Sequence, residues 1–548
     1  MIGLVWATAS GRSTAARLAP LGDVRRYPVR DMATAWRECD ALVVLLAAGA
    51  VVRLVAPLLQ GKTVDPGVVC VDEGRRFAVA LLGGHAGGAN DLAVTVADLL
   101  GGTAVLTTAT DAVGLPGLDT LGWPVEGAVA AVSRAMLDGE PVQLRADATW
   151  PLPPLPVGEE GEHVLAVTDR LLGLDALTAV LRPPSLVVGV GASRGVGVEE
   201  LDGLVQRTLA DAGLSVASVT VLATVEAKMD EPGLLALAER HGWALAVHPA
   251  QRLAAVEAPH PSAAPLAAVG TSSVAEAAAM LAGDLVVPKT KSAMATVAVA
   301  RVRPRGRLAL VGLGPGARDL LTPRARTELR RASVWVGLDQ YVDQVRDLAR
   351  PGTRMLVSGL GHEQERAHSA VEAARGGAAV ALLGSGDAGV YAMASPALEV
   401  AGPDIDVVGV PGVTAALAAA ALLGAPLGHD HASISLSDLH TPWGAIETRV
   451  RAVAEADLVV TFYNPRSRDR DWQLPKALGI LAEHRPSCTP AGVVTDASRP
   501  AETVTLTTLG ELDPAQVTMY SCVVVGSSQS TLAAGRFVTP RGYRWADG

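Results

Sequence analysis

Short apolar runs alternate with longer stretches rich in Ala, Leu and charged residues along the whole chain. The apolar runs include LVVLLAAG, FAVALLGG, SLVVGVGAS, LALVGLGPG, AAVALLGSG, LVVTFYNP and SCVVVGSS. Buried strands produce such runs, and strands that alternate with helices predict an α/β fold with parallel or mixed sheets. Several runs lead directly into glycine-containing loops, and open α/β sheets bind their ligands at that edge.

Two breaks in composition predict several domains. The first break, residues 140–184, contains WPLPPLPVGEEGE and ends in LRPPS, and its prolines disfavour a continuous helix or a central strand, so we expect a linker with a small helix inside. The second, ARVRPRGR at 300–307, is followed at once by the strand-like LALVG. The expected organisation is a domain at 1–139, a mid region at 140–184, a second domain at 185–303 and a C-terminal domain at 307–548.

Composition and charge narrow the function classes. The 548 residues carry a net charge of -10 and are 49% apolar, which favours an enzyme of several domains over a nucleic-acid-binding protein. The four cysteines lie far apart, so we expect neither disulfides nor a metal site. The most apolar stretch, ALVVLLAAGAVV, is shorter than the ~20 residues that span a bilayer, and the N-terminus lacks signal-peptide features. A cytoplasmic protein without a membrane partner is expected.

The loop after LALVG has a dinucleotide-binding pattern. Residues 312–317 read G-x-G-x-x-A, and Asp339 follows the next strand-like run. Short matches of this kind are common by chance, and Pro315 removes a backbone N–H that could bind a phosphate. A dinucleotide-dependent oxidoreductase therefore remains one alternative.

Further motifs in the same segment carry a more specific signal. They are VGLGPG with LLTPRARTELRRASVWVG, then LLGSGDAGVYAMAS, VGVPGVTAALAAAALLGAPLGHD and TFYNPRS, in that order. With these motifs the segment resembles the tetrapyrrole methyltransferases along its whole length. ISLSDLHTPW, FYNPRSRDRDWQL and GSSQSTLAAGRFVTPRGY resemble the members that methylate carbon 17 of precorrin-3B or of cobalt-factor III. Two residues depart from the usual pattern, His440 and Ser527.

The resemblance implies a two-lobed fold, S-adenosyl-L-methionine as cofactor, methylation with ring contraction to (cobalt-)precorrin-4, and a homodimer. It implies that the cofactor site is lined by Gly314, Pro315, Gly384, Ser385, Gly386, Asp387, Val390, Tyr391, Pro411, Gly412, Thr414, Phe462, Tyr463 and Asn464. Glycines let a backbone pass close to a ligand. The alternative is that these residues only form the strand-to-helix turns.

Two further sets of side chains are candidates for the methyltransferase reaction. A rearrangement coupled to methylation benefits from a positioned acid or base, and the candidates for that role are Asp438, His440 and Ser437. A lone His in a loop is more often a surface residue. Precorrins carry acetate and propionate groups, and guanidinium pairs well with carboxylate, so Arg466 and Arg541 are the expected substrate contacts. Arg468 and Arg470 follow Arg466 in the same loop, and for these two a solvated charged loop is at least as good an interpretation as a substrate contact.

The N-terminal half carries a second ordered set of motifs. They include LLAAGAVVRLVAPLLQGKTVDPGVVCVDEG, LLGGHAGGANDLA, TTATD, VGVGASRGVGVEEL, ATVEAKMDEPGL and VGTSSVAEAAAMLAGDLVVPKTKSAMATVAVAR. Residues 1–303 thereby resemble the cobalt-precorrin-5A hydrolase family. The loop GASRG replaces the more usual GCRRG and keeps Arg194, which we expect to contact substrate.

The resemblance implies that this half opens a lactone of the contracted ring and releases acetaldehyde. Such hydrolysis needs an activated water and stabilisation of an oxyanion. No G-x-S-x-G or H-E-x-x-H pattern is present, so the candidates are His85 in its glycine-rich loop, Lys62 and Asp72. We predict a bifunctional enzyme, and the alternative is a methyltransferase with a non-catalytic tetrapyrrole-binding module.

Overall fold

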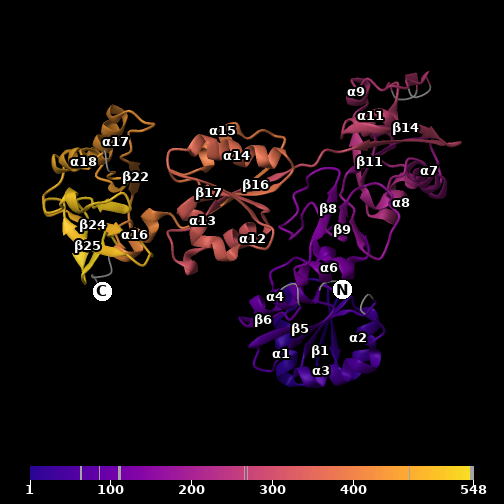
Figure 1. Ribbon diagram of the computed structural model, residues 1–548. Helices are drawn as coiled ribbons and strands as arrows, with labels where there is room; N and C mark the ends of the chain where they lie inside the picture. Colours follow the sequence, from indigo (N-terminus) through magenta and orange to yellow (C-terminus); the bar gives the residue numbers. More distant parts are fainter. Residues whose placement is uncertain are drawn as a thin grey trace. The chain divides into compact units, whose positions relative to one another are not determined.

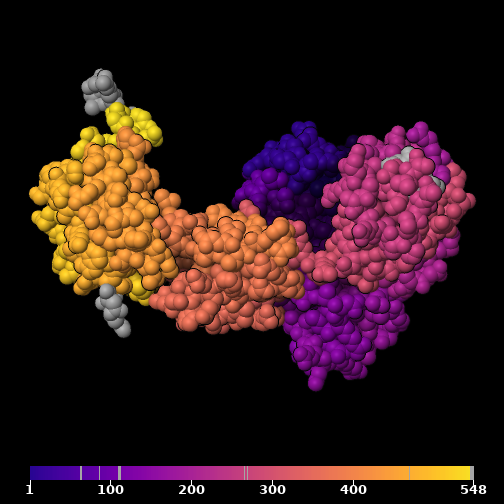
Figure 2. Space-filling model, turned by 90° about the horizontal axis from the view of Figure 1, so that it is seen from above, coloured from indigo at the N-terminus to yellow at the C-terminus, as the bar shows by residue number. Residues whose placement is uncertain are grey.

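The computed structural model describes residues 1–61, 64–84, 87–108, 113–263, 266–267, 270–467 and 470–543. The chain divides into two compact units, coloured by residue number in Figures 1 and 2. Unit 1 comprises Met1–Thr149, Leu155–Pro304 and Arg350–Gly352, and unit 2 comprises Trp150–Pro154, Arg305–Ala349 and Thr353–Gly548. Both units pack helices against sheets, so the predicted α/β class is confirmed.

The first sheet of unit 1 has the order β2-β1-β3-β4-β5-β6. Its strands are β1 Ile2–Trp6, β2 Val24–Pro28, β3 Ala41–Leu45, β4 Gly67–Val71, β5 Phe77–Leu82 and β6 Thr103–Val105, and its helices are α1 Ala9–Arg17, α2 Met32–Glu38, α3 Ala48–Val55 and α4 Ala89–Leu100. Strand β4 is parallel to β3, but β5 turns back antiparallel to β4. The loop after β5 therefore lies at the edge where β4 begins.

The second sheet of unit 1, of order β7-β10-β9-β8, includes the region expected as a linker. Its elements are β7 Val125–Gly127, α6 Val129–Asp138, β8 Val142–Ala146, β9 His163–Val167 and β10 Thr178–Leu181. The expectation of a linker with a small helix at 140–184 was wrong, because this stretch forms three strands and none of its residues, all of them described, is helical. Its prolines lie between strands, where they interrupt no ladder.

The third sheet of unit 1 has the order β13-β12-β11-β15-β14. Its strands are β11 Leu186–Ala192, β12 Val219–Val225, β13 Ala244–His248, β14 Asp284–Lys291 and β15 Ala295–Arg301, and its helices are α7 Val198–Asp211, α8 Pro232–His241, α9 Ala250–Ala254 and α11 Val274–Met280. Helix α11 packs directly on β11, since a Cβ on Gly189 would lie 1.9 Å from the Ala275 carbonyl oxygen. Gly189 thus permits this close contact of helix and strand.

Unit 2 begins with a parallel sheet of order β18-β17-β19-β16-β20, which we call the first lobe (residues 307–413). Its strands are β16 Arg307–Gly312, β17 Val334–Leu338, β18 Arg354–Ser358, β19 Ala379–Gly384 and β20 Asp406–Val410. Helices α12 Pro323–Arg331 and α13 Asp339–Val345 cover one face, and α14 Glu363–Arg375 and α15 Ala394–Val400 cover the other (Figure 1). All five strands end at the same edge.

The second lobe (residues 415–538) is a mixed sheet of order β22-β23-β26-β24-β25. Its strands are β22 His431–Ser435, β23 Val459–Tyr463, β24 Pro490–Thr495, β25 Thr503–Thr508 and β26 Ser521–Val525. Helix α16 Ala415–Leu423 packs on one face, and α17 Trp443–Glu455 and α18 Gln473–Ala482 pack on the other. A small sheet adds β21 Gly424–Ala425, β27 Thr531–Ala533 and β28 Arg536–Val538. Strands β22, β23 and β24 share one carboxyl edge.

Candidate active site

Three of the predicted cofactor loops meet at the carboxyl edge of the first lobe. They follow β16, β19 and β20, which are neighbours in the sheet. The Leu313 N–H donates to the Gly384 carbonyl at 2.9 Å. Gly314 and Gly386 exchange two backbone hydrogen bonds, of 3.0 and 2.8 Å. The first two loops therefore form one hydrogen-bonded surface.

Glycines make the close packing of these loops possible. Gly314 and Gly386 have φ angles of +74° and +64°, which favour glycine. A Cβ on Gly412 would lie 2.1 Å from the Gly386 carbonyl oxygen, and one on Gly312 would lie 2.7 Å from the Gly412 nitrogen. These four glycines are required by contacts between the loops themselves.

Asp387 fastens the second loop to the third. Its Oδ1 accepts a hydrogen bond from the Gly389 N–H at 2.8 Å, and its Oδ2 accepts one from the Gly412 N–H at 3.0 Å. The carboxylate thus fixes the turn of its own loop and the position of the loop after β20. The Pro411 carbonyl accepts a further bond from the Thr322 hydroxyl at 3.3 Å.

Two tyrosines from different lobes meet beside these loops. The rings of Tyr391 and Tyr463 lie 5.1 Å apart, and burial raises the pKa of both phenols. The Tyr391 hydroxyl donates to the Ser433 carbonyl at 2.8 Å, and Tyr391 has a φ of +51°. The Tyr463 hydroxyl lies 2.7 Å from the Thr414 hydroxyl and accepts the Ala416 N–H at 2.9 Å. Side chains of both lobes thus border the same loops.

Phe462 is placed differently from the other predicted cofactor residues. Phe462 is fully buried, and its ring lies in the core under α17 and α18. Neighbouring residues of a strand point to opposite faces, so Phe462 and Tyr463 cannot both face the loops. Val390, in contrast, packs against the cluster that contains Tyr463 and Phe537. The structure does not bring the Phe462 side chain together with the cofactor loops.

The candidate acid or base Asp438 lies at the carboxyl edge of the second lobe. Its Oδ2 accepts a hydrogen bond from the Gln473 amide at 3.0 Å, and Arg470 lies 3.9 Å from its Oδ1. Arg470 also donates to the carbonyls of Asn464 (2.6 Å) and Leu436 (2.9 Å). Burial lowers the pKa of Arg470. This arginine therefore joins the two loops that follow β22 and β23.

The other predicted side chains of this lobe are more peripheral. His440 is exposed. Arg466 donates from one terminal nitrogen to the backbone carbonyls of Pro514 (3.3 Å) and Ala515 (2.9 Å), so part of its guanidinium binds the protein itself. Arg468 lies outside the described residues. Of the described arginines on this loop, Arg470 is the one held against the candidate site.

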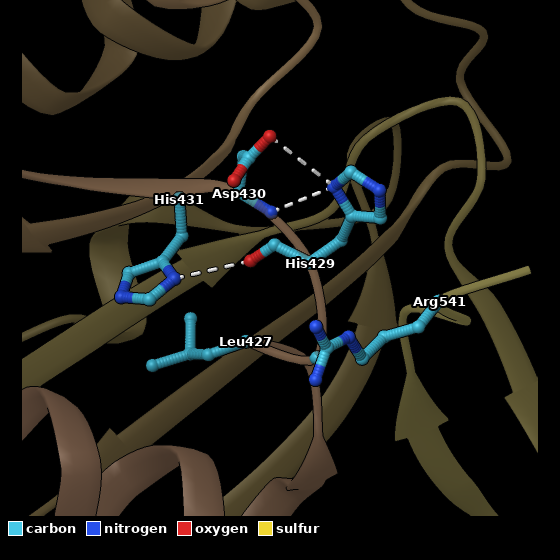
Figure 3. Close-up of a pocket in the computed structure, with 6 residues that line it drawn as sticks. Leu427, His429, Asp430, His431 and Arg541 are labelled. Atoms are coloured by element: carbon cyan, nitrogen blue, oxygen red, sulfur yellow. Dashed lines mark hydrogen bonds and ion pairs between the residues drawn. The ribbon is translucent and has the colours of Figure 1, made fainter.

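Arg541 lies in a cavity of about 380 Å³ (Figure 3). The other lining residues are those of the segment 427–431, which joins β21 to β22. In Figure 3 the Arg541 side chain extends toward this segment, and the His429 ring accepts the Asp430 N–H at 2.8 Å. Two imidazoles, one guanidinium and one carboxylate make this wall polar, and Arg541 supplies its fixed positive charge.

Two residues of the site were missed from the sequence. Arg499, in the loop after β24, donates from Nε to the Pro315 carbonyl at 2.9 Å and from a terminal nitrogen to the Ser385 hydroxyl at 3.4 Å. The neighbouring Ser498 hydroxyl accepts the Ala317 N–H at 3.1 Å. The available signal was an arginine in the loop that follows a strand, at the same edge as Tyr463.

The loop after β16 does not have the geometry of a dinucleotide site. In such sites a helix opens directly at the glycines and its N-terminus holds the pyrophosphate. Here α12 begins only at Pro323, after a separate short turn at Arg318–Leu320. The N–H groups of Gly314 and Gly386 are used within the loops. The oxidoreductase alternative is therefore not supported.

In unit 1 a cavity of about 370 Å³ lies at the carboxyl end of β5. It is lined by Leu59, Gln60, Gly61, Asp65, Leu82 and Gly83. The Asp65 carboxylate accepts the N–H groups of Gln60 (2.9 Å) and Gly61 (3.2 Å). The predicted residues Lys62 and His85 lie outside the described residues, but their loops contribute this lining.

Asp72 and Arg194 are not part of that cavity lining. Asp72 closes the β4–β5 hairpin, where it accepts the Phe77 N–H at 2.8 Å and pairs with Arg76 at 3.2 Å. The six residues of β5 separate it from Gly83, roughly 20 Å at about 3.4 Å per residue. Arg194 is exposed in the loop after β11. The structure thus brings Asp65, but not Asp72, to the loops of Lys62 and His85.

Among the described residues, no group of three or more His, Cys, Asp or Glu side chains is arranged to hold a metal ion. In the same part of the chain, no helix combines the length and apolarity needed to cross a membrane.

Loops from two α/β lobes form this site, which is an arrangement typical of enzymes that bind a ligand between two lobes. Comparison with known proteins identifies the family. Residues 307–513 match the family described as Tetrapyrrole (Corrin/Porphyrin) Methylases. A probable cobalt-factor III C(17)-methyltransferase of Salmonella typhimurium is 45% identical over 240 residues, which are 43% of this chain and 99% of that protein. The chain belongs to the tetrapyrrole methylases, and the predicted resemblance is confirmed.

Two further relatives cover the same region. A precorrin-3B C(17)-methyltransferase of Sinorhizobium sp is 38% identical over 41% of this chain and 91% of that protein. The crystal structure of the methyltransferase CobJ matches at 36% identity over 43% of this chain and 100% of that chain, with a TM-score of 0.41. Some other curated relatives are longer, and the chain spans 46% to 48% of their length.

The N-terminal half matches two further families. Residues 31–111 match Cobalamin synthesis G N-terminal, and residues 186–300 match Cobalamin synthesis G C-terminus. These matches confirm the predicted resemblance of unit 1. The stretch between them, 112–185, contains the second sheet.

Proposed function

We propose that unit 2 is an S-adenosyl-L-methionine-dependent methyltransferase that acts on carbon 17 of precorrin-3B or cobalt-factor III. Ring contraction accompanies the methylation and yields precorrin-4 or its cobalt form. The observation that carries the proposal is the joining of the loops after β16, β19 and β20 to Tyr463 of the second lobe. The names of the Salmonella and Sinorhizobium relatives support the choice of carbon 17.

The described loops fit this cofactor. Its sulfonium, ribose and adenine carry no phosphate, so its site needs close backbone approach rather than a cationic cradle. The backbones of Gly314, Gly386 and the Pro411–Thr414 loop meet without space for side chains between them. Tyr391 is 53% exposed, and an aromatic face attracts a cation such as a sulfonium. We assign cofactor binding to these loops together with Tyr391 and Tyr463.

The cofactor supplies the methyl group, and the protein holds the donor and the accepting carbon in line. Correct positioning alone supplies a large share of the rate enhancement of such a displacement. In our proposal Asp387 and Arg499 fix the loops, and Asp438 holds or accepts a proton during the rearrangement. The hydrogen bond from Gln473 fixes the orientation of the Asp438 carboxylate. His440, being exposed, is the weaker candidate for the same role.

An anionic tetrapyrrole needs cationic contacts on an acidic protein. The cavity with Arg541, His429 and His431 supports the proposal that carboxylates of the substrate bind there. Guanidinium binds carboxylate in a bidentate manner, which also fixes its orientation. Arg466 is the weaker substrate contact, because one of its terminal nitrogens already binds Pro514 and Ala515.

The test is methyl transfer by the purified full chain. Precorrin-3B and cobalt-factor III are offered separately with S-adenosyl-L-methionine, and mass spectrometry follows the tetrapyrrole and S-adenosylhomocysteine. We expect one of them to gain a single methyl group, and the better acceptor shows whether the substrate carries cobalt. A chain that methylates neither acceptor would refute the proposal.

For unit 1 we propose hydrolysis of the cobalt-precorrin-5A lactone with release of acetaldehyde. The cavity between the loops of Lys62 and His85, with the Asp65 carboxylate in its wall, favours catalysis over a purely binding module. Hydrolysis needs a polar group that orients an activated water, and the Asp65 carboxylate is such a group in this lining. His85 is our candidate for the general acid or base of this reaction.

The hydrolase proposal is tested by acetaldehyde release from cobalt-precorrin-5A. We expect His85→Ala to lower the rate by on the order of 10²-fold, the usual contribution of a general acid or base. The matched control is Asp72→Asn, because this carboxylate only closes the β4–β5 turn. An unchanged rate in His85→Ala would favour the non-catalytic module or a different site.

A further inference from the structure

Helix α14 carries an arginine that faces the interior of the first lobe. Arg366 is only 5% exposed. Its guanidinium donates to the Ser358 hydroxyl at 3.1 Å and to the Gly359 carbonyl at 2.7 Å, and it lies 3.6 Å from the Met393 sulfur. All three partners are neutral. Within the described residues, no carboxylate forms an ion pair with it.

Another arginine of the same helix, Arg375, has the carboxylate partners that Arg366 lacks among the described residues. Arg375, at the end of α14, pairs with Glu372 at 2.7 Å and with Asp404 at 3.0 Å. It is 37% exposed, so solvent also screens its charge. Arg366 is shielded from solvent and pairs with no carboxylate in the described part of the chain.

An uncompensated buried guanidinium is costly, because arginine stays charged at any physiological pH. Arginine has five N–H donors, and the three contacts of Arg366 do not use all of them. A bound anion would supply the missing charge and the missing acceptors. The chemistry of this position is therefore that of a site for an anionic ligand.

Arg366 lies at the edge where the cofactor loops lie. Ser358 and Gly359 end β18, and Met393 ends the loop that begins at Gly384. Strand β17 runs between β18 and β19, and the helix after it carries Tyr341. The pKa of Tyr341 is raised by burial, while Arg499, Arg366 and a hydrogen bond to Ser385 act in the opposite direction.

Arg499 approaches the same place from the second lobe. Its contacts with the Pro315 carbonyl and the Ser385 hydroxyl place its guanidinium on the cofactor loops. Asp496 lies 3.7 Å away and compensates part of its charge. Arg499 thus contacts the loop after β19 at Ser385, and Arg366 contacts the same loop at Met393.

We propose that Arg366 and Arg499 form a carboxylate-binding subsite beside the Ser385 loop. The inference rests on the proposed function, because both reactants carry carboxylates. One is the amino-acid carboxylate of the cofactor, and the others are the acetate and propionate groups of the tetrapyrrole. Arg366 supplies the buried, uncompensated charge, and Arg499 completes the subsite from the other lobe.

The experiment compares two nucleosides on the full chain by calorimetry. S-adenosylhomocysteine has the amino-acid carboxylate, and 5′-methylthioadenosine lacks it. If the subsite binds the cofactor, Arg366→Gln weakens S-adenosylhomocysteine by roughly 10- to 100-fold, the range of a charged hydrogen bond, and leaves 5′-methylthioadenosine unchanged. If it binds the substrate, both Kd values stay constant and the KM for the tetrapyrrole rises by a similar factor.

Either result supports the subsite and assigns its ligand. Equal weakening of both nucleosides, or no change in any Kd or KM, overturns it. Arg366→Lys keeps the charge and is expected to keep more of the affinity, and this variant tests the subsite should Arg366→Gln not fold. Arg375→Gln is the matched control on the same helix and is expected to leave all three constants unchanged.

Failure of the proposed function gives a different result. A wild-type chain that binds neither nucleoside and methylates no tetrapyrrole would overturn the function and the subsite together. A wild-type chain that binds S-adenosylhomocysteine, with Arg366→Gln and Arg499→Gln unaffected in every constant, would overturn the subsite alone.

Discussion

Gly412 provides the sharpest test of the loop packing that underlies the proposed cofactor site. In Gly412→Ala the new Cβ would lie 2.1 Å from the Gly386 carbonyl oxygen. A carbon normally stays about 3.3 Å from a carbonyl oxygen, so the loops must separate by roughly 1.2 Å. Because both partners are backbone, no side-chain rotation can relieve the contact.

A displacement of about 1 Å in an active site costs on the order of 10²-fold in rate. We therefore expect kcat/KM for methyl transfer to fall by on the order of 10²-fold in Gly412→Ala, equivalent to about 2.7 kcal/mol of transition-state stabilisation. The Kd for S-adenosylhomocysteine is expected to rise as well. Single-turnover methyl transfer and calorimetry measure the two effects.

Gly409→Ala is the matched control for this substitution. Gly409 lies three residues earlier, within strand β20, is exposed, and has open space within 4 Å of the point where a Cβ would stand. We expect wild-type rate and affinity from this variant. If Gly412→Ala behaves like Gly409→Ala in both measurements, the close contact of the loops does not determine cofactor binding, and the reasoning is refuted.

Three further predictions concern single hydrogen-bonded groups. Asp387→Asn replaces an acceptor of two N–H groups by an amide with one acceptor, and the Kd for S-adenosylhomocysteine should rise by about 10-fold or more; an unchanged Kd would contradict the fastening role. Tyr463→Phe should lower the free energy of unfolding by about 1–3 kcal/mol, measured in urea, because the Ala416 N–H loses its acceptor. Burial alone raises the pKa of Asp169, but hydrogen bonds from Arg301 and Ser185 outweigh burial and hold the pKa below its ordinary value. The carboxylate therefore stabilises the folded state fully above about pH 4, and this stability is lost as the pH falls through the lower pKa of the folded state. Thermal unfolding between pH 2 and 6 should show this loss in the wild type and less of it in Asp169→Asn; equal slopes would contradict the assignment.

The sequence predicts most of the first lobe of unit 2 and the place of its loops. The strands that carry the cofactor loops are continuous apolar runs that lead into glycine-containing turns, and parallel strands bring such ends to one edge. The predicted loops around Gly314, Gly386 and Gly412 accordingly meet. The alternation of side chains along β23 also follows from the sequence, and it predicts that Phe462 and Tyr463 point to opposite faces of the sheet.

The contacts that sequence reasoning missed depend on long-range pairing. Arg499 contacts Pro315, 184 residues earlier in the chain, and no local pattern connects the two. The strands at 140–184 are short and separated by stretches that contain prolines, and they form through pairing with one another and with β7. Asp72 stands in a turn sequence between two apolar runs, and that turn reverses the chain and moves the loop of His85 to the opposite edge.

The loop after β24 also limits how this fold can be recombined. Ser498 and Arg499 belong to the second lobe by their strand, yet their partners are Ala317, Pro315 and Ser385 of the first lobe. A chimera that exchanges whole lobes between family members would therefore separate matched partners. A chimera should take the first lobe and residues 496–502 from the same parent. The residues that hold the cofactor loops together therefore come from two segments that are separate in the chain.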